Sequence, residues 1–377
     1  MSNGEVMRIG FDAAPVFSSF SGIGQYVRSL FSAMMAAAPE IEWVGFVPPG
    51  CPDVPPSLMP HPLVSYRSKG LTLQLRGLTG IRNSLDIYHG TNFKAPNFGQ
   101  SKSVLTIHDL WLTRNPQYSK KFFGQGVSSW RLGRRAARMS KVIAVSQFSA
   151  REIHEIFGVP REQIAVIYHG CSSNMYLEPH VEKFQEFSQR FGFSGKPYVL
   201  FVGGAEPRKN HRTLFQAFAS SRQLAKNFCL VAVGDTNTRG ENLFRTASEF
   251  GISKNVYCPG LVTEEELRAL YSFAHVFVFP SFYEGFGIPV LEAMACGAPV
   301  VAADCAALPE IAGEAAIYVN PQNVEELAFR MEQFLGDNAQ QALMRERGFQ
   351  HVRQFTWDRA AKETLSVYRE VIASHCS

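Results

Sequence analysis

A glycine-rich stretch with a carboxylate at each end, Glu284–Glu292, carries residues that could bind an anion. The apolar run Val276–Phe279 before it has the pattern of a short buried strand that stops at Pro280, and Pro289 suits the first turn of a following helix. A strand, a glycine loop and a helix present backbone N–H groups and the positive end of the helix to a ligand. This stretch therefore predicts a phosphate site.

Two adjacent cations, Arg208 and Lys209, follow another predicted strand, Tyr198–Val202, and its turn, Gly203-Gly204. Lysine offers phosphate a point charge, and arginine offers it a bidentate fork. An isolated Arg-Lys pair is more often a solvated surface feature. The prediction of a second anion site rests on finding the pair at the same sheet edge as the Glu284–Glu292 loop. Together the two sites could match the roughly two negative charges of a diphosphate.

In the first half of the chain, His108 and Asp109 directly follow the apolar run Ser103–Ile107. Similar strands with polar residues at their ends are expected at Leu85–Tyr88, before His89-Gly90-Thr91-Asn92, and at Val142–Val145, before Ser146-Gln147. The carboxyl ends of parallel strands meet at one edge, so these side chains are predicted to converge on a site. A lone histidine is more often a core or capping residue, and His108 is favoured because the pair ends its strand.

The chain opens with a Rossmann-like pattern. A strand at Met7–Phe11 ends at Asp12, and Ser21-Gly22-Ile23-Gly24 leads into a helix over Gln25–Ala37. A dinucleotide fingerprint requires a third glycine and an acidic residue at the end of the next strand, and this sequence has neither. The pattern therefore argues against a nicotinamide enzyme.

Length and composition favour a globular protein of two domains. The chain has 377 residues, of which 46% are hydrophobic and 19% charged, and its net charge of +4 is too small to predict nucleic-acid binding. We expect an N-terminal domain at residues 1–172 and a C-terminal domain at residues 173–355, with the polar stretch Ser172–Lys196 as an irregular linker. The last helix, about Trp357–Ala373, belongs to residues 356–377 and is expected to pack back on the first domain.

The location in the cell follows from two absences in the sequence. No apolar run approaches the ~18 residues that span a bilayer, and Met1–Glu5 lacks the apolar core of a secretion signal, so we expect a cytoplasmic protein. The seven cysteines form an odd set without a C-x-x-C pair, which argues against a disulfide framework and a structural zinc site.

The segment Ser119–Lys141 is basic and contains no acidic residue. Its seven basic residues are interleaved with Phe122, Phe123 and Trp130. Such a segment can lie on an anionic membrane surface at the inner face of the membrane, or bind a phosphorylated acceptor. The alternative interpretation is an ordinary solvated helix face.

Five motifs in order carry a resemblance to a known family. They are Ser21-Gly22-Ile23-Gly24, His108-Asp109, Val145-Ser146-Gln147-Phe148-Ser149, Glu206-Pro207-Arg208-Lys209-Asn210, and Glu284 to Glu292 followed by Cys296-Gly297-Ala298-Pro299-Val300. Over nearly its whole length the chain resembles glycosyltransferase family 4, retaining enzymes of the GT-B fold. That α/β fold has two Rossmann-like parallel-sheet domains facing across a cleft. Within the family, Ile9–Asp12 with Ser21–Leu30, and Thr106–Asn115, are similar to bacterial mannosyltransferases that build surface polysaccharides such as O-antigen.

The resemblance implies roles in donor binding for the second half. Glu284 and the backbone of Phe286, Gly287 and Ile288 would face the transferred sugar and the diphosphate, and Glu292 would accept hydrogen bonds from the ribose hydroxyls. Lys209 with Arg208 would hold the diphosphate and stabilise charge on the departing nucleotide. The chain departs from many family members after Gly204, where Ala205 replaces an arginine. The diphosphate clamp would then depend more on Lys209 and Arg208.

For the first half, the resemblance implies contacts from the opposite side of the donor. Gly22 would let its loop approach the phosphates closely, His108 would lie over the donor sugar, and Asp109 would lie beside it. No D-x-D stands at a strand end as in metal-dependent nucleotide sites, and the family works without a divalent cation. We therefore expect no metal and no cofactor other than the nucleotide-sugar co-substrate.

The expected reaction is a retaining transfer of a sugar to a glycan or a lipid-linked saccharide. GDP-mannose is the leading donor, with UDP-sugars or other GDP-sugars as alternatives, and attack on the face that the nucleotide leaves is favoured on family grounds over a double displacement. One alternative function is a sugar phosphorylase or synthase of the same fold. Another, of a different class, is a non-catalytic scaffold that binds nucleotide sugars, against which the intact Lys209, Glu284 and Glu292 argue.

Overall fold

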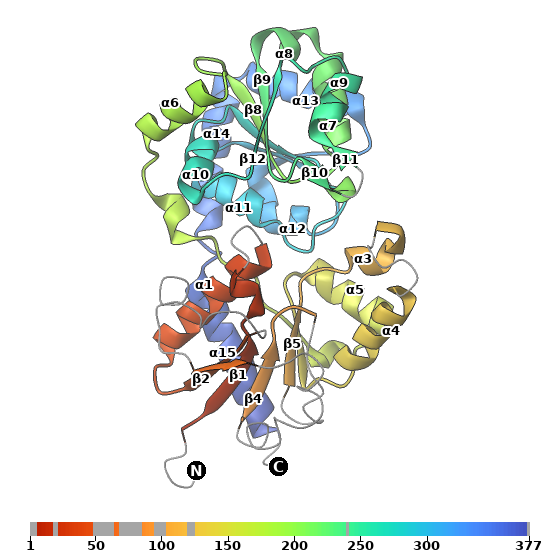
Figure 1. The fold of residues 1–377 in the computed structure, drawn as a ribbon, viewed down its shortest axis with the longest axis vertical. Coiled ribbons are helices and arrows are strands. Elements are labelled where there is room, and N and C mark those ends of the chain that lie inside the picture. The colour runs from red at the N-terminus through yellow and green to blue at the C-terminus, as the bar shows by residue number, and fades with distance from the viewer. Residues whose placement is uncertain are drawn as a thin grey trace. The chain divides into compact units, whose positions relative to one another are not determined.

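The computed structural model describes residues 6–17, 22–47, 64–67, 85–93, 103–118, 125–238 and 241–374. The chain forms two compact units, each built around its own sheet (Figure 1). The first consists of Met1–Gly170 together with Phe355–Ser377, and the second of Cys171–Gln354. The first observed boundary, after Gly170, lies two residues before the expected one after residue 172. The second, after Gln354, lies one residue before the expected one after residue 355.

Seven parallel strands of the described residues form the sheet of the first unit, in the order β3-β2-β1-β4-β5-β6-β7. They are β1 (Arg8–Asp12), β2 (Glu42–Val47), β3 (Val64–Arg67), β4 (Ile87–Gly90), β5 (Ser103–Ile107), β6 (Lys141–Ala144) and β7 (Ile164–Val166). Among the described residues, the α-helices of this unit are α1 (Gly22–Ala37), α3 (Trp111–Arg114), α4 (Gln125–Ala136), α5 (Gln147–Phe157) and α15 (Trp357–Ala373).

Helices α1 and α15 pack together on one face of this sheet (Figure 1). The helix predicted over Gln25–Ala37 is confirmed, and its apolar residues Val27, Leu30, Phe31, Met34 and Met35 are all buried. On α15, Leu365, Tyr368 and Val371 are buried in the same core. A helix separated from the rest of its unit by the whole second unit thus supplies part of the first core.

Six parallel strands of the described residues form the sheet of the second unit, in the order β12-β9-β8-β13-β14-β15. They are β8 (Tyr198–Val202), β9 (Cys229–Val233), β12 (Val256–Gly260), β13 (Val276–Phe279), β14 (Val300–Ala303) and β15 (Ala316–Val319). The helices are α6 (Val181–Arg190), α7 (His211–Ser220), α8 (Arg222–Asn227), α9 (Leu243–Glu249), α10 (Glu264–Ser272), α11 (Ile288–Ala295), α12 (Leu308–Ala312), α13 (Val324–Leu335) and α14 (Asn338–Val352).

Both sheets follow the strand order of a Rossmann fold, in which the chain reverses direction next to the first strand. The prediction of two Rossmann-like parallel-sheet domains is therefore confirmed. The central strands are apolar runs buried along their length, as expected for parallel strands that helices cover on both faces.

The prediction that Ser172–Lys196 is an irregular linker is wrong. This stretch contains α6, whose Phe184 ring lies 4.5 Å from the ring of Phe273, just after α10, and also stacks on Tyr198 of β8. Most of the helix is polar and exposed, so its few apolar positions gave a weak periodic signal. Its stability comes from these tertiary contacts, which a local pattern cannot show.

Candidate active site

The second sheet brings the predicted anion-binding residues together at its switch point. Strands β8 and β13 are neighbours at the centre, and the chain leaves them toward opposite edges of the sheet. Arg208 and Lys209 lie in the 3-10 turn Pro207–Lys209 after β8, and Glu284 lies in the loop after β13. Ligands of open parallel sheets bind beyond the carboxyl ends of two such strands.

Glu284 pairs with both cations. Its Oε1 lies 2.7 Å from Nζ of Lys209 and its Oε2 lies 2.8 Å from Nη1 of Arg208. The Nε of Arg208 lies 2.8 Å from Oε2 of Glu206. We call Glu206, Arg208, Lys209 and Glu284 the ion cluster. It brings together the predicted residues Arg208, Lys209 and Glu284. The ion pair between Glu206 and Arg208 was not predicted.

Burial and charge oppose each other in the ion cluster. Burial alone would raise the pKa of Glu284, but the charges of Arg208 and Lys209 outweigh it and hold the pKa below its usual value. Burial lowers the pKa of Lys209, and the partnership with Glu284 offsets only part of that effect. Glu284 is therefore an anion at neutral pH although its side chain is only 8% exposed.

Asn210 fixes the backbone beneath the two cations, a role that sequence reasoning missed. It adopts a left-handed conformation with φ of 56°, and its side-chain amide donates to the carbonyl oxygens of Pro280 at 2.9 Å and Pro321 at 2.7 Å. The backbone N–H of Phe282 donates to the carbonyl of Arg208 at 2.8 Å. The available signal was the asparagine itself, one of the few residue types that tolerate a positive φ.

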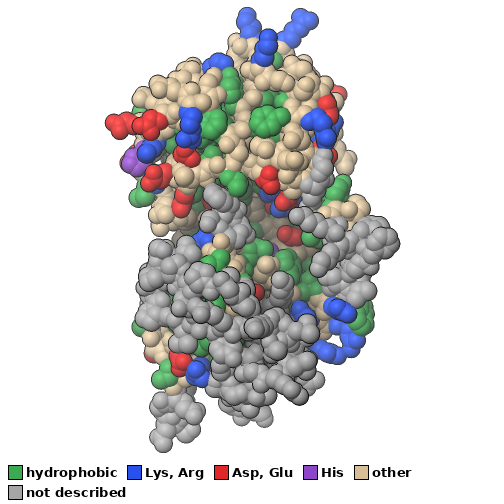
Figure 2. Space-filling model, viewed as in Figure 1, with side chains coloured by type: hydrophobic (Ala, Val, Ile, Leu, Met, Phe, Trp, Pro, Cys, Tyr) green, Lys and Arg blue, Asp and Glu red, His purple; other side chains and the backbone are tan. Residues whose placement is uncertain are grey.

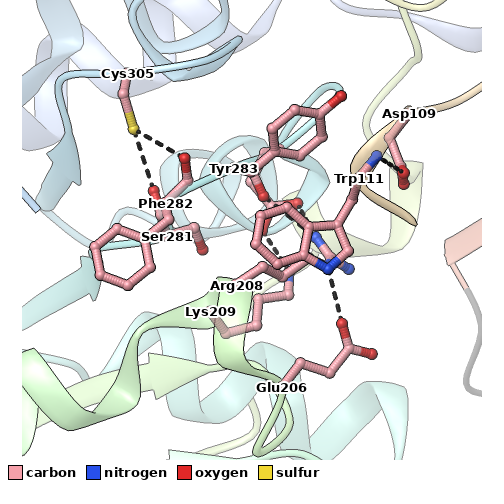
Figure 3. A network of polar contacts seen from close by, with 10 residues as sticks. Asp109, Trp111, Glu206, Arg208, Lys209, Ser281, Phe282, Tyr283 and Cys305 are labelled. Atoms are coloured by element: carbon pink, nitrogen blue, oxygen red, sulfur yellow. Dashed lines mark hydrogen bonds and ion pairs between the residues drawn. The ribbon is translucent and has the colours of Figure 1, made fainter. Parts of the chain in front are cut away.

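A second turn supports the Glu284 loop from the side of β14. The thiol of Cys305 lies 3.4 Å from each of the carbonyl oxygens of Ser281 and Phe282 (Figure 3). The backbone N–H of Ala307 donates to the carbonyl of Glu284 at 3.3 Å. The loop that carries Glu284 is thus held by contacts from both neighbouring turns.

Helix α11 begins where the sequence predicted an anion-binding helix end. Gly287 is its N-cap with φ of 117°, and a Cβ atom there would lie 2.9 Å from Cδ2 of Leu308, so a glycine is required. Phe286 is buried beside it, and Ile288 is the first helical residue. Glu292 lies one turn further along, 5% exposed, with the hydroxyl of Tyr271 3.5 Å from its Oε2.

Gly204 lies where two turns cross closely. A Cβ atom on Gly204 would lie 3.2 Å from the carbonyl oxygen of Asp235, and the N–H of Ala205 donates to that same oxygen at 2.7 Å. The side chain of Ala205 is fully buried. The position after Gly204 therefore faces the protein interior, and the cations of this turn come from Arg208 and Lys209.

His108, at the end of β5, is buried and fixed by its neighbours. Its Nε2 lies 2.9 Å from the carbonyl oxygen of Thr91, and a carbonyl only accepts, so Nε2 carries a proton. Burial lowers the pKa of His108, so the ring is neutral and Nδ1 is an acceptor. Asp109 has a local contact, since its Oδ1 accepts from the N–H of Trp111 at 3.0 Å at the start of α3.

Two polar residues that were expected at the same edge stabilise the fold instead. His89 belongs to β4, is fully buried, and bonds to Tyr368 and Thr106, so its predicted place in a turn is wrong and the core interpretation holds. Ser146 caps α5 by accepting from the N–H of Ser149 at 3.0 Å. Gly22 is the first residue of α1, where a Cβ atom would meet no atom within 4 Å, and Ser21 lies outside the described residues.

In the part of the chain that the structure describes, no group of three or more His, Cys, Asp or Glu side chains is arranged to hold a metal ion. The cysteines described there, Cys171, Cys229, Cys258, Cys296 and Cys305, are free thiols. None of the helices in these ranges is both long enough and apolar enough to cross a membrane.

Comparison with known proteins matches both units to families. The family model described as Glycosyltransferase Family 4 matches residues 20–174, and the one described as Glycosyl transferases group 1 matches residues 183–351. The O-antigen chain mannosyltransferase B of Escherichia coli is 29% identical over 391 residues, covering 96% of this chain and 100% of that protein. The MMP alpha-(1->4)-mannosyltransferase of Mycolicibacterium hassiacum is 31% identical over 243 residues, covering 63% of this chain and 56% of that protein.

A solved structure shares the fold over almost the whole chain. HepE from Anabaena, in complex with UDP and glucose, superimposes with a TM-score of 0.76 at 19% identity, covering 96% of this chain and 100% of that one. At this identity the likeness establishes the fold.

Proposed function

We propose that this chain, which belongs to glycosyltransferase family 4, transfers mannose from GDP-mannose to a glycan or lipid-linked saccharide with retention and without a metal ion. The observation that carries the proposal is the ion cluster at the switch point of the second sheet, next to the start of α11. The choice of mannose follows the Escherichia coli mannosyltransferase that aligns over the full length.

The ion cluster suits a diphosphate that arrives and leaves as an anion. Arg208 and Lys209 are held together by Glu284, and a donor phosphate would take over part of that pairing. The carboxylate of Glu284 would then accept hydrogen bonds from sugar hydroxyls, and the two cations would stabilise the charge that grows on the departing nucleotide. In this proposal Glu292 accepts from the ribose, and His108, through its acceptor Nδ1, receives a hydroxyl of the donor sugar.

A thermal-shift series tests the donor. A ligand that binds only the folded protein raises the melting temperature by mass action. We expect GDP and GDP-mannose to raise it, equally with and without EDTA, and UDP and UDP-glucose to raise it less. A larger shift with the UDP compounds would overturn the choice of GDP-mannose, and a shift abolished by EDTA would overturn metal independence.

The anomeric configuration of the product tests retention. The α-linked donor should give an α-linked mannosyl product, which proton–carbon coupling at the anomeric centre identifies in NMR spectra. A β-linked product would overturn the retaining mechanism. Release of GDP with mannose 1-phosphate or a free disaccharide as product, in assays with phosphate or free sugars, would favour a phosphorylase or synthase instead. Binding without any turnover would favour a scaffold.

We also propose that α4 contacts anionic lipid, so that the enzyme works at a membrane surface. Trp130 on this helix is 58% exposed, with the guanidinium of Arg134 4.7 Å from the centre of its ring. Arg131, Arg134 and Arg138 are exposed, and Figure 2 shows basic side chains over α4. Lys141 does not join this surface, because it pairs with Glu370 at 2.7 Å. Residues 119–124 of the predicted basic segment lie outside the described residues.

Vesicle sedimentation at low salt tests this contact. Each basic residue near an anionic surface contributes on the order of 1 kcal/mol, so replacing Arg131, Arg134 and Arg138 by Gln should release the protein from vesicles with acidic lipid. The matched control replaces Arg222 and Lys226, exposed cations of α8, by Gln and should leave binding unchanged. Equal retention of both variants would remove α4 from the proposal.

A further inference from the structure

Tyr26, on the second turn of α1, lies among the rings of His108, His169 and Trp357. Its ring meets the ring of His108 edge-on, with centroids 4.7 Å apart at 83°. The centroid of His169 lies 4.8 Å away, and that of Trp357 lies 6.1 Å away. Tyr26 is 4% exposed and His108 8% exposed, so the edge contact is made in a packed interior.

The hydroxyl of Tyr26 begins a chain of buried hydrogen bonds. It lies 2.9 Å from Oγ1 of Thr106, which lies 2.7 Å from Nε2 of His89. The Nδ1 of His89 lies 2.7 Å from the hydroxyl of Tyr368 on α15. We call Tyr26, Thr106, His89 and Tyr368 the hydroxyl chain. It connects α1, β5, β4 and α15 through the middle of the first unit.

The proton count couples the bonds of the hydroxyl chain to one another. Each hydroxyl has one proton to donate, and neutral His89 has one donor and one acceptor nitrogen. Burial lowers the pKa of His89 to about 3, so the ring is neutral under ordinary conditions. When Tyr368 accepts from Nδ1 of His89, Nε2 accepts from Thr106, and Tyr26 is then the donor in its bond to Thr106. When Tyr368 donates, Thr106 accepts from Nε2 and can either donate to Tyr26 or accept from it.

Thr106 and His108 lie two residues apart around the end of β5, so their side chains project to the same face. Tyr26 spans both, with its hydroxyl on Thr106 and its ring on the edge of His108. His108 is therefore fixed at two points, by Thr91 at Nε2 and by Tyr26 against the ring. These two contacts set the direction in which Nδ1 points.

We propose that Tyr26 is a positioning residue for His108, and that Tyr368 of the C-terminal helix holds Tyr26 in place through the hydroxyl chain. The proposal rests on the proposed function in that His108 meets the donor. Tyr26 also lies one turn after Gly22, so the same residue fixes the start of α1 and His108 relative to each other.

Three variants separate the parts of this arrangement. Tyr26→Leu removes the ring, Tyr26→Phe removes the hydroxyl alone, and Tyr368→Phe removes the far end of the hydroxyl chain. Tyr198→Phe is the matched control, because it deletes a fully buried hydroxyl that donates to the carbonyl of Leu270 at 2.6 Å in the second unit. The control also loses one buried hydrogen bond, but that bond belongs to the second unit and not to the hydroxyl chain.

The first measurement is the ¹⁵N spectrum of histidine-labelled full-length protein, with His108 assigned by comparison with His108→Gln. In the wild type we expect one tautomer of His108, protonated at Nε2. Tyr26→Leu should shift the His108 resonances most, and Tyr26→Phe and Tyr368→Phe should shift them less. Tyr198→Phe should leave them in place. Wild-type resonances in both Tyr26→Leu and Tyr368→Phe would overturn the proposal.

The second measurement is steady-state kinetics with the donor varied. Misplacing a contact group by about 1 Å can cost as much as 10²-fold, and we expect Tyr26→Leu to lower kcat about tenfold with the donor KM little changed. Tyr26→Phe and Tyr368→Phe should lower kcat by smaller factors, and Tyr198→Phe should not lower it. Full activity of His108→Gln would remove His108 from the proposed function, and the imidazole resonances would still decide whether Tyr26 positions it.

Discussion

The two units bury polar groups next to their switch points in opposite ways. In the second unit, the ion cluster places Glu284 within 2.8 Å of both Arg208 and Lys209, so charge is balanced by charge. In the first unit, the hydroxyl chain contains neutral groups only, and burial lowers the pKa of His89, His108 and His169 alike. The ion cluster is built from charged side chains, and the hydroxyl chain is built from neutral ones.

The difference suits two tasks in one transfer reaction. In the proposed reaction, the diphosphate of the donor would replace part of the pairing of Arg208 and Lys209 with Glu284. A buried chain of neutral hydrogen-bonding groups has a defined geometry. The second unit is therefore suited to holding a charged group that comes and goes, and the first to keeping one ring in a fixed orientation.

Breaking the charge balance should have the largest effect. Glu284→Gln leaves Arg208 and Lys209 without their shared counter-charge and removes the acceptor for sugar hydroxyls, so transfer should fall by about 10²-fold or more. Lys209→Ala should cause a loss of similar size. Initial rates of GDP release and product formation measure the effect. Glu265→Gln, an exposed carboxylate in the first turn of α10, is the control and should keep wild-type rates. Near-normal turnover of both Glu284→Gln and Lys209→Ala would show that the ion cluster is not the reaction site.

The buried neutral histidines of the first unit should make the free energy of unfolding depend on pH. The pKa of His89 is lowered from its usual 6.5 to about 3 in the folded protein. Between pH 6.5 and about 3, the unfolded chain therefore binds a proton that the folded chain does not. Stability should therefore fall as the pH drops below about 6.5, by up to about 1.4 kcal/mol per pH unit for each such histidine. Glu284, with a lowered pKa, should lose its contribution only below its unfolded value of 4.5.

Tryptophan fluorescence can follow this effect in the first unit alone. All of the tryptophans, Trp43, Trp111, Trp130 and Trp357, belong to the first unit. In urea titrations between pH 7 and 5, the free energy of unfolding of His89→Asn should fall less steeply with decreasing pH than that of the wild type. The difference in slope should be up to about 1.4 kcal/mol per pH unit. Parallel curves for the variant and the wild type would show that folding does not lower the pKa of His89.

A smaller effect separates backbone strain from close packing at the start of α11. Gly287 and Gly195 both have a positive φ, 117° and 72°, but only the Cβ of an alanine at 287 would meet a neighbour, Leu308. We expect Gly195→Ala to lower the free energy of unfolding by about 1 kcal/mol without changing activity, and Gly287→Ala to cost more and to slow transfer. Circular dichroism melts and initial rates measure both. Equal effects of the two variants would show that the packing against Leu308 has no importance.

Much of the fold was predictable because strand patterns are local. The strands Tyr198–Val202 and Val276–Phe279 and the helix Trp357–Ala373 match their predicted bounds, since apolar runs end at clear turn residues or caps.

The parts that escaped prediction depend on contacts distant in sequence. His89 and Tyr368 are 279 positions apart, and Lys209 and Glu284 are 75 apart. No spacing rule links such residues, so the sequence could indicate an edge rich in polar groups but could not distinguish His89, which belongs to the core, from His108. The roles of Asn210 and Tyr26 depend in the same way on the atoms that surround them in the folded protein.

The placement of α15 in the first unit has a consequence for how the protein is made. About 180 residues separate Gly170 from Phe355, and at ~5–20 residues per second a ribosome needs on the order of ten to forty seconds to add them. During that interval the face of α1 that α15 later covers lacks this helix, and at its end the second unit has all of its own residues. The unit synthesised second can therefore complete its core first, and the first unit becomes whole only when its last helix leaves the ribosome.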